Sequence, residues 1–167
     1  HGRTRWAINA TGLDMWRTDP NPLTQVYHAR FGDLADLTRC LETHAGTIAA
    51  IIAEPIQGNG GINVPDAQFW QQVRTLCDAH GVLLIFDEIQ SGINRTGSWF
   101  ACEHWQTTPD IIASSKALGN GFPIAAFTTT DEIAASYSRP GASTYGGNPV
   151  CAAAALATLD FHEANNL

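Results

Sequence analysis

Three short, mostly apolar runs in this chain each lead into a charged side chain. They are residues 47–53 before Glu54, residues 82–86 before Asp87, and residues 109–113 before Lys116. A continuous apolar run of this length is typical of a strand that is buried on both faces of a parallel sheet. Such sheets bind ligands at the carboxyl ends of their strands, so the three charged groups mark the edge at which a ligand is expected.

Helical patterns separate these predicted strands. Apolar residues recur at helical spacing in residues 33–45 and 66–80, and Gly81 follows the second segment as a typical C-cap. The alanine-rich segment 149–165 is a third predicted helix, with Pro149 well placed in its first turn.

A fourth apolar run, residues 124–128, predicts another strand, whereas residues 1–30 show no period and are expected to be irregular. Strands that alternate with helices predict an α/β fold, in which a mostly parallel sheet carries helices on both faces. The chain has 167 residues, which is enough for one such domain with its own core.

The composition excludes several classes of function. The net charge is −7 and no basic stripe exists, which argues against a nucleic-acid partner. The apolar runs are about one strand long and no leader pattern is present, so we expect a cytoplasmic protein without a membrane partner. Four widely spaced cysteines without zinc-type spacing predict reduced thiols and no metal site. The dinucleotide fingerprint fails at Asn63, and no phosphate-binding loop with a terminal lysine occurs.

Lys116 follows a predicted strand and precedes a glycine-rich turn, residues 117–123. Partial desolvation at such a place lowers the pKa of a lysine and frees its amine as a nucleophile, which is what Schiff-base formation needs. A lysine at a strand end can equally extend its ammonium group into solvent without any chemical role. The residue taken alone leaves both interpretations open.

Asp87 ends the most apolar run, where an uncompensated carboxylate would be costly. It therefore needs a cationic partner or several donors. A protonated pyridine nitrogen would supply the cation, and the carboxylate would keep the ring an electron sink. The structural alternative is an aspartate that caps the next turn by accepting backbone N–H groups.

Seven motifs stand in a characteristic order along nearly the whole chain. They are residues 1–4, 53–58, 87–97, 100–103, 109–111, 115–124 and 143–149. Together they closely resemble the signature of class III pyridoxal-phosphate-dependent aminotransferases. The resemblance implies the fold of the type I pyridoxal-phosphate transferases, with residues 1–167 as the central part of the large, cofactor-binding domain.

The resemblance also implies roles for matching residues. Lys116 would bind pyridoxal 5'-phosphate as a Schiff base and act as the general base, and Asp87 would pair with the pyridine nitrogen. Gln90 would hydrogen-bond the phenolate oxygen of the ring. His1 and Gly2 match the end of the family's cofactor-binding Tyr-His-Gly motif.

Two further residues have implied roles. Thr144 would bind the cofactor phosphate held by a neighbouring subunit, which implies a homodimer. Glu54 would lie near the amino-donor site; the alternative is an ordinary strand-end acid on a solvated loop.

Parts of the family's cofactor site have no counterpart in the sequence. These are the upstream Gly-Ser or Ser-Gly turn that binds phosphate, the aromatic residue before His1, and the small-domain arginine that holds the substrate carboxylate. The chain also starts at His1 without a methionine, so we expect a fragment that lacks an N-terminal segment and the C-terminal small domain. Residues 1–167 alone are expected to be a poor catalyst or inactive.

The implied reaction moves an amino group from an amino acid or ω-amine to a 2-oxo acid. Within the family, the turn at residues 119–123 and the threonine-rich strand after it most resemble alanine–glyoxylate and aminobutyrate-type members. One alternative is an aminomutase or other isomerase on the same scaffold, which would share Lys116 and Asp87. The other is a truncated module without catalytic activity.

Overall fold

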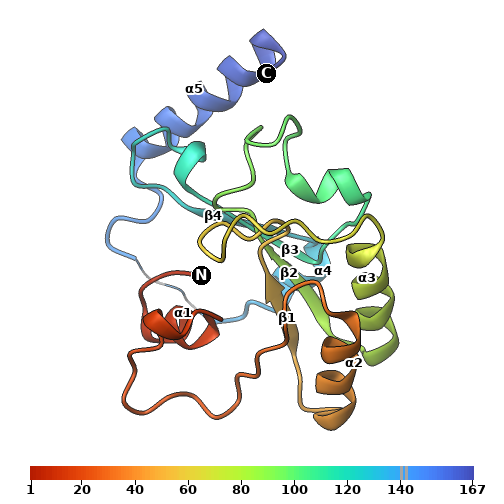
Figure 1. Ribbon diagram of the computed structural model, residues 1–167. Coiled ribbons are helices and arrows are strands. Elements are labelled where there is room, and N and C mark those ends of the chain that lie inside the picture. Colours follow the sequence, from red (N-terminus) through yellow and green to blue (C-terminus); the bar gives the residue numbers. More distant parts are fainter. Residues whose placement is uncertain (140, 142) are drawn as a thin grey trace.

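A four-stranded sheet forms the centre of the protein (Figure 1). The structure, a computed structural model, describes residues 1–139, 141 and 143–167. The strands, in their spatial order, are β1 (Ala50–Ala53), β2 (Leu83–Asp87), β3 (Ile111–Ser114) and β4 (Ala126–Thr129). The first three run parallel, and β4 is antiparallel to β3. The predicted α/β class with a mostly parallel sheet is confirmed.

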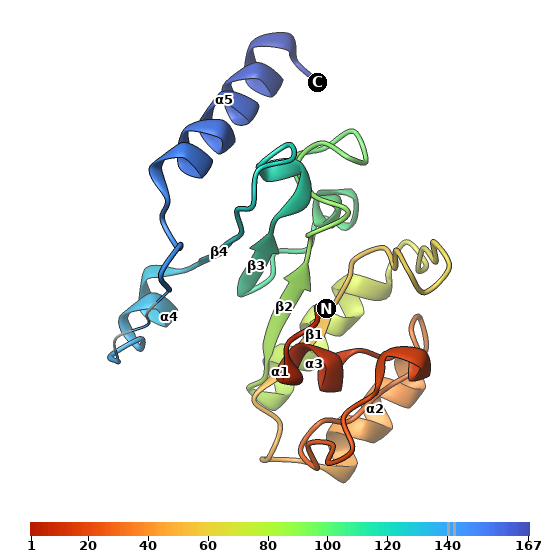
Figure 2. The same ribbon diagram turned by 90° about the vertical axis from the view of Figure 1, so that its left-hand side faces the viewer.

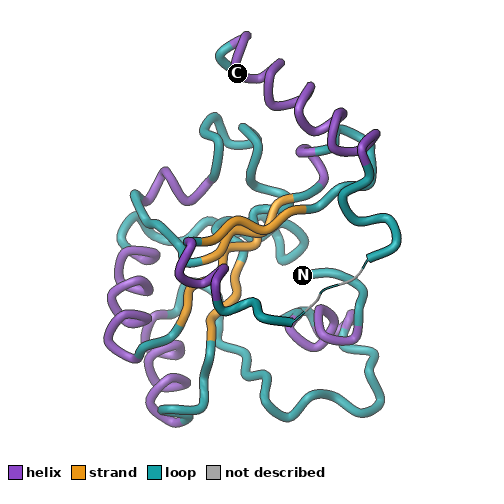
Figure 3. The backbone as a smooth tube through the Cα atoms, turned by 180° about the vertical axis from the view of Figure 1, so that it is seen from behind, coloured by secondary structure: helices purple, strands orange, loops and turns teal. Residues whose placement is uncertain are grey.

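Five α-helices and three short 3-10 helices accompany the sheet in the described residues. They are α1 (Arg5–Ala10), η1 (Asp14–Trp16), α2 (Leu34–Thr43), α3 (Phe69–His80), η2 (Ala101–Trp105), η3 (Lys116–Leu118), α4 (Asp131–Ala135) and α5 (Pro149–Asn165). Helices α2 and α3 lie together on one side of the sheet and α1 lies on the other, as the view from behind also shows (Figure 3). Helix α5 extends away from the sheet (Figure 2). In the part of the chain that the structure describes, no helix combines the length and apolar character needed to cross a membrane.

The three predicted helices are confirmed as α2, α3 and α5. Residues at one end of each helix fix where it begins or ends. Asp33 precedes α2 and its carboxylate accepts a hydrogen bond from the Asp36 N–H at 2.9 Å. Gly81 ends α3 in the left-handed conformation with φ 64°. Asn148 precedes α5 and accepts from the first-turn N–H groups, and Pro149 opens the helix.

Residues 1–30 are more ordered than the sequence indicated, because they contain α1 and η1. A six-residue helix is too short to show a period, and its stability comes from side-chain contacts. Thr4 caps α1 by accepting from the Ala7 N–H at 3.3 Å. The buried Asn9 donates to the Asp19 carboxylate at 3.0 Å and accepts from the Leu23 N–H at 2.8 Å, which ties α1 to the following loop.

The expected burial of the strands on both faces holds for β2 but not for the outer strands. Leu84 and Phe86 of β2 are fully buried. Ile52 in β1 is 40% exposed and lines a cavity, and Phe127 in β4 is 69% exposed. These strands are the first and last of the sheet, and helices α2 and α3 cover only one of its faces.

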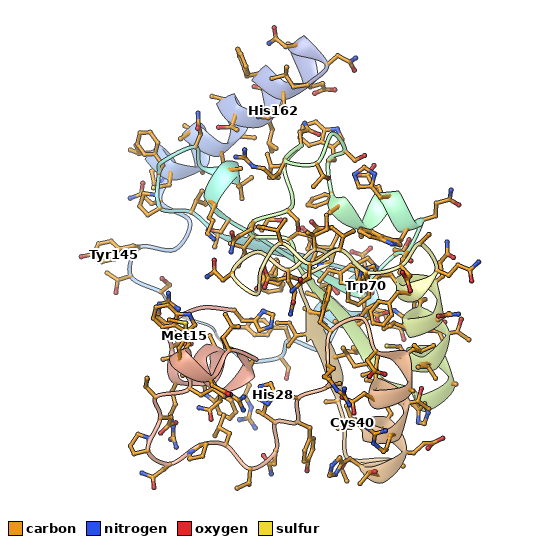
Figure 4. All side chains as sticks on the ribbon, in the orientation of Figure 1. Met15, His28, Cys40, Trp70, Tyr145 and His162 are labelled. Carbon is orange, nitrogen blue, oxygen red and sulfur yellow. The ribbon has the colours of Figure 1, made fainter. Side chains whose placement is uncertain are left out.

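The main core lies between the sheet and helices α2 and α3. Trp70, labelled in Figure 4, meets Phe86 edge-on with ring centroids 4.8 Å apart. The Trp70 indole N–H donates to the Pro55 carbonyl at 3.0 Å, so the buried ring is also satisfied as a donor. Because each fully buried large side chain contributes roughly 1.5–3 kcal/mol, this packing holds β2 firmly. The same strand presents Asp87 at its carboxyl end.

Candidate active site

A cavity of about 1300 Å³ opens beside β1 and the carboxyl end of β2. Its walls come from the N-terminal segment, β1, the loop after β1, the end of β2 and the start of η3. Six of the seven residues that the sequence singled out line it: His1, Gly2, Glu54, Asp87, Gln90 and Lys116. The seventh, Thr144, is exposed and lies outside the lining.

Asp87 is 6% exposed, and the structure shows the turn-capping interpretation together with a side-chain partner that the sequence did not indicate. Its Oδ2 atom lies 2.7 Å from Nδ1 of His1, a partner from the far end of the chain. Its Oδ1 atom accepts a hydrogen bond from the Ile89 N–H at 3.2 Å, which caps the following turn. A carboxylate offers about four acceptor positions, so Asp87 can still accept from a group bound in the cavity.

Glu88 is a residue at this site that the sequence pattern did not single out. Its carboxylate is 1% exposed and accepts three hydrogen bonds: from the Ser91 hydroxyl at 2.6 Å, the Ala101 N–H at 3.1 Å and the Cys102 N–H at 2.9 Å. The signal was present in the sequence. Successive side chains at a strand end point to opposite faces, so two adjacent acids cannot both face one cavity. Glu88 therefore points into the protein and anchors the end of β2 from behind.

Lys116 begins η3 and lines the cavity. Its side chain is exposed, so the expected partial desolvation of the amine at the strand end is not found. The reason is its position in a turn beyond β3, outside the strand itself. Its backbone has φ 42°, in the left-handed region that non-glycine residues seldom occupy.

The turn after Lys116 is tightly built. The Ser115 hydroxyl donates to the Ile124 carbonyl at 2.7 Å and so closes the base of the turn. A Cβ atom added at Gly119 would lie 2.3 Å from the Phe122 carbonyl oxygen, so only glycine fits there.

Glu54 and Gln90 both contact Gly58 in the loop after β1. The Gly58 N–H donates to Oε2 of Glu54 at 2.9 Å, which gives this carboxylate a local structural partner. The Gln90 amide packs against Gly58, since an added Cβ there would lie 2.8 Å from the Gln90 Cδ. Glu54 therefore shapes the surface on which Gln90 rests.

The two buried cysteines, Cys77 and Cys102, are poorly suited to act as nucleophiles. Burial raises the pKa of Cys77 to about 11, and burial together with the neighbouring Glu88 raises the pKa of Cys102 to about 12. Both thiols are thus protonated near neutral pH. Within the described ranges, no cluster of three or more His, Cys, Asp or Glu side chains is placed to hold a metal ion.

The family profile described as Aminotransferase class-III matches residues 1–167, the whole of the chain. The chain belongs to the class III aminotransferase family. Among its relatives, the acetylornithine/succinyldiaminopimelate aminotransferase of Yersinia pestis is 44% identical over 163 residues. That alignment covers 96% of this chain and 39% of the Yersinia protein. This relative carries a different name from the alanine–glyoxylate and aminobutyrate types that the turn at residues 119–123 most resembles.

Solved structures of this family share the fold. A transaminase from the marine bacterium Virgibacillus superposes with a TM-score of 0.92 at 29% identity, covering 99% of this chain and 41% of that one. The ornithine aminotransferase of Toxoplasma gondii, described with partial occupancy of PLP at its active site, gives a TM-score of 0.88 at 33% identity. The superposition covers 99% of this chain and 39% of the Toxoplasma protein. This class III chain thus spans less than half the length of these relatives.

Proposed function

We propose that the protein containing this chain is a pyridoxal-phosphate-dependent aminotransferase. It moves an amino group from an amino acid or ω-amine to a 2-oxo acid, with Lys116 binding the cofactor covalently. The observation that carries this proposal is the meeting of a buried carboxylate, Asp87, and an exposed primary amine, Lys116, at one cavity. Family membership supplies the class of chemistry.

The residues of the cavity fit pyridoxal 5'-phosphate. The volume of about 1300 Å³ is ample for a cofactor and a substrate together. Asp87 keeps acceptor capacity for a ring N–H, and its contact with His1 holds the carboxylate in one orientation. The relative from Toxoplasma gondii, whose fold is shared, binds PLP.

Bound pyridoxal phosphate supplies an electron sink for the substrate carbon that loses its proton. The chain's own residues do the remaining work. The Asp87 carboxylate would stabilise a proton on the ring nitrogen, and the Gln90 amide would donate to the ring oxygen. Lys116 would hold the cofactor covalently through its amine, and the same amine, when free, would move the substrate proton as a general base.

The amino donor that we propose is a diamino acid with one acylated amine. Relatives at 44% identity carry acetylornithine and succinyldiaminopimelate in their names. Glu54 lines the same cavity as Lys116, which supports a role for its side chain near the donor. Activity assays of the complete gene product with N-acylated diamino acids, free diamino acids and simple ω-amines would rank these donors.

We also infer a homodimer in which Thr144 serves the partner's site. Thr144 is exposed and lies outside the cavity of its own chain, which suits a hydroxyl that binds a phosphate elsewhere. Residues 1–167 then form the central part of the large domain. All four cysteines are free, in keeping with a cytoplasmic location.

The decisive experiment is cofactor trapping on the complete gene product. Protein saturated with pyridoxal phosphate is reduced with borohydride and digested, and the modified peptide is identified by mass spectrometry. We expect the adduct on Lys116 and none in Lys116→Arg. An adduct on another lysine in the wild-type protein would refute the assignment.

Product analysis separates aminotransferase from isomerase. An aminotransferase converts the amino donor to an oxo compound and leaves its amino group on the 2-oxo acid acceptor. An aminomutase returns a rearranged amine and needs no acceptor. Turnover that is independent of a 2-oxo acid would therefore favour the second reaction on the same residues.

A further inference from the structure

We propose that Ser115 is a positioning residue that aims the Lys116 amine into the cavity. The inference rests on the proposed role of Lys116 and adds a residue that does not itself line the cavity. Its basis is a side-chain hydrogen bond directly beside a strained backbone.

The strain lies at Lys116. Its φ of 42° places a residue with a long side chain in the left-handed region. Such a conformation persists only where surrounding contacts over-determine it. Because the direction of the side chain follows from the backbone of its own residue, the contacts that hold this φ also decide where the amine points.

Ser115 holds the turn at both of its ends. Its carbonyl accepts from the Leu118 N–H at 2.9 Å, and its hydroxyl donates to the Ile124 carbonyl at 2.7 Å. The first bond folds η3, and the second joins the residue before Lys116 to the residue that leads into β4. Lys116 therefore lies in a turn that the Ser115 hydroxyl closes just beyond the Ser114–Ala126 pair, the last pair of the β3–β4 ladder.

The far side of the turn is already fixed by packing. Leu118 is buried in a small apolar cluster with Ile93 and Ala155, and the latter belongs to α5. Asn120 N–H donates back to the Lys116 carbonyl at 3.2 Å. With its far side held in this way, the turn has one side-chain hydrogen bond at its base, and loss of that bond would let Lys116 relax from its φ rather than unfold the domain.

A matched control exists elsewhere in the chain. The Ser136 hydroxyl donates to the Ile133 carbonyl, also at 2.7 Å, at the exposed end of α4. Ser136→Ala thus removes a hydrogen bond of the same type and length away from the cavity. Ser115→Thr keeps the hydroxyl and serves as the conservative variant.

The first test needs no cofactor. Hydrogen exchange of residues 116–124 is measured in the complete, cofactor-free gene product. We expect Ser115→Ala to speed exchange of the Gly119 and Asn120 amides roughly three- to tenfold, as befits one lost hydrogen bond. Ser115→Thr and Ser136→Ala should leave these amides at the wild-type rate. Exchange at the wild-type rate in Ser115→Ala would overturn the inference. This outcome does not depend on whether Lys116 binds the cofactor.

The second test asks whether the Ser115 hydrogen bond affects the reactivity of the Lys116 amine. The rate of covalent trapping of pyridoxal phosphate on Lys116 is compared between wild-type protein and the three variants. We expect a roughly three- to tenfold slower rate in Ser115→Ala, with rescue by Ser115→Thr. A turn that loosens while trapping stays at the wild-type rate would show that Ser115 is merely structural. Absence of trapping in the wild-type protein would instead contradict the proposed function.

Discussion

The Nδ1 atom of His1 lies 2.7 Å from Oδ2 of Asp87, although 86 positions separate these residues in the sequence. Both side chains are largely buried. A carboxylate can only accept in such a contact, so the ring nitrogen donates to it when Asp87 is ionised. The first residue of the chain thereby orients the carboxylate at the end of β2.

Replacing His1 should therefore weaken cofactor binding. A hydrogen bond to a charged group contributes about 1.5–3 kcal/mol, so we expect His1→Ala to lower the affinity for pyridoxal phosphate at least roughly tenfold. His1→Gln, which keeps an N–H donor, should lose less. Titration of the apoprotein with the cofactor measures this, with the exposed His80→Ala as control. Equal affinities for His1→Ala and His80→Ala would count against the role of the contact.

Asp87 should contribute more to catalysis than Gln90. Asp87 would make a charged contact with the ring nitrogen in a buried site, whereas Gln90 would make a neutral hydrogen bond to the ring oxygen. We expect Asp87→Ala to lower kcat/KM about tenfold further than Gln90→Ala does. Similar losses in the two variants would contradict the assigned roles.

Glu88 should contribute to stability through its three donors. In Glu88→Gln the amide NH₂ faces groups that themselves donate, so buried N–H groups lose their acceptor, and we expect the free energy of unfolding to fall by about 2–4 kcal/mol. Urea denaturation of the complete protein measures the change. Glu103 is a matched control, since its exposed carboxylate accepts a single bond, from the Phe100 N–H at 2.7 Å. If Glu88→Gln costs no more than Glu103→Gln, the buried network is not a main support of β2.

Gly58 should act through Gln90. A Cβ at position 58 would lie 2.8 Å from the Gln90 amide group, so Gly58→Ala must displace this side chain. We expect Gly58→Ala to lower kcat/KM by about as much as Gln90→Ala, and the double variant to be no worse than either single one. Additive losses in this double-mutant cycle would show that the two residues act independently.

Asp19 should show a low pKa that can be measured directly. Hydrogen bonds from the Arg5 side chain, from the Asn21 backbone N–H and from the Asn9 side chain lower the pKa of Asp19 from 3.8 to about 2. A carboxyl with a depressed pKa stabilises the fold above its unfolded pKa, and this contribution is lost as the pH falls from about 4 to about 2.

An NMR titration of the Asp19 carboxyl checks the value, and Asp19→Asn checks the consequence for stability. The variant should be less stable than wild type at pH 6, and the difference should shrink as the pH falls toward about 2. Asp160→Asn, on the exposed side of α5, controls for the loss of a charge. A difference that stays constant over this range would contradict the low pKa.

The sequence by itself determined the local structure and the order of the motifs. Helices α2, α3 and α5 appear where the sequence predicted them, and Asp33, Gly81 and Asn148 fix their ends by acting on backbone groups a few residues away. Strand β2 was predictable from its own residues, because a short continuous apolar run is typical of a strand buried in a parallel sheet. The family signature followed from spacing along the chain, and the class III profile confirms it.

Only the tertiary structure decided how side chains are paired and which of them are covered. The contact of His1 with Asp87 joins the two ends of a long loop of sequence, and no pattern within a few residues encodes it. Burial of Glu88 depends on η2 folding back over β2 to present two N–H groups. The exposure of Lys116 depends on a turn held by Ser115 and by packing against α5. Each of these outcomes is a property of segments that meet in space, and it is set by the sum of long-range packing rather than by local preference.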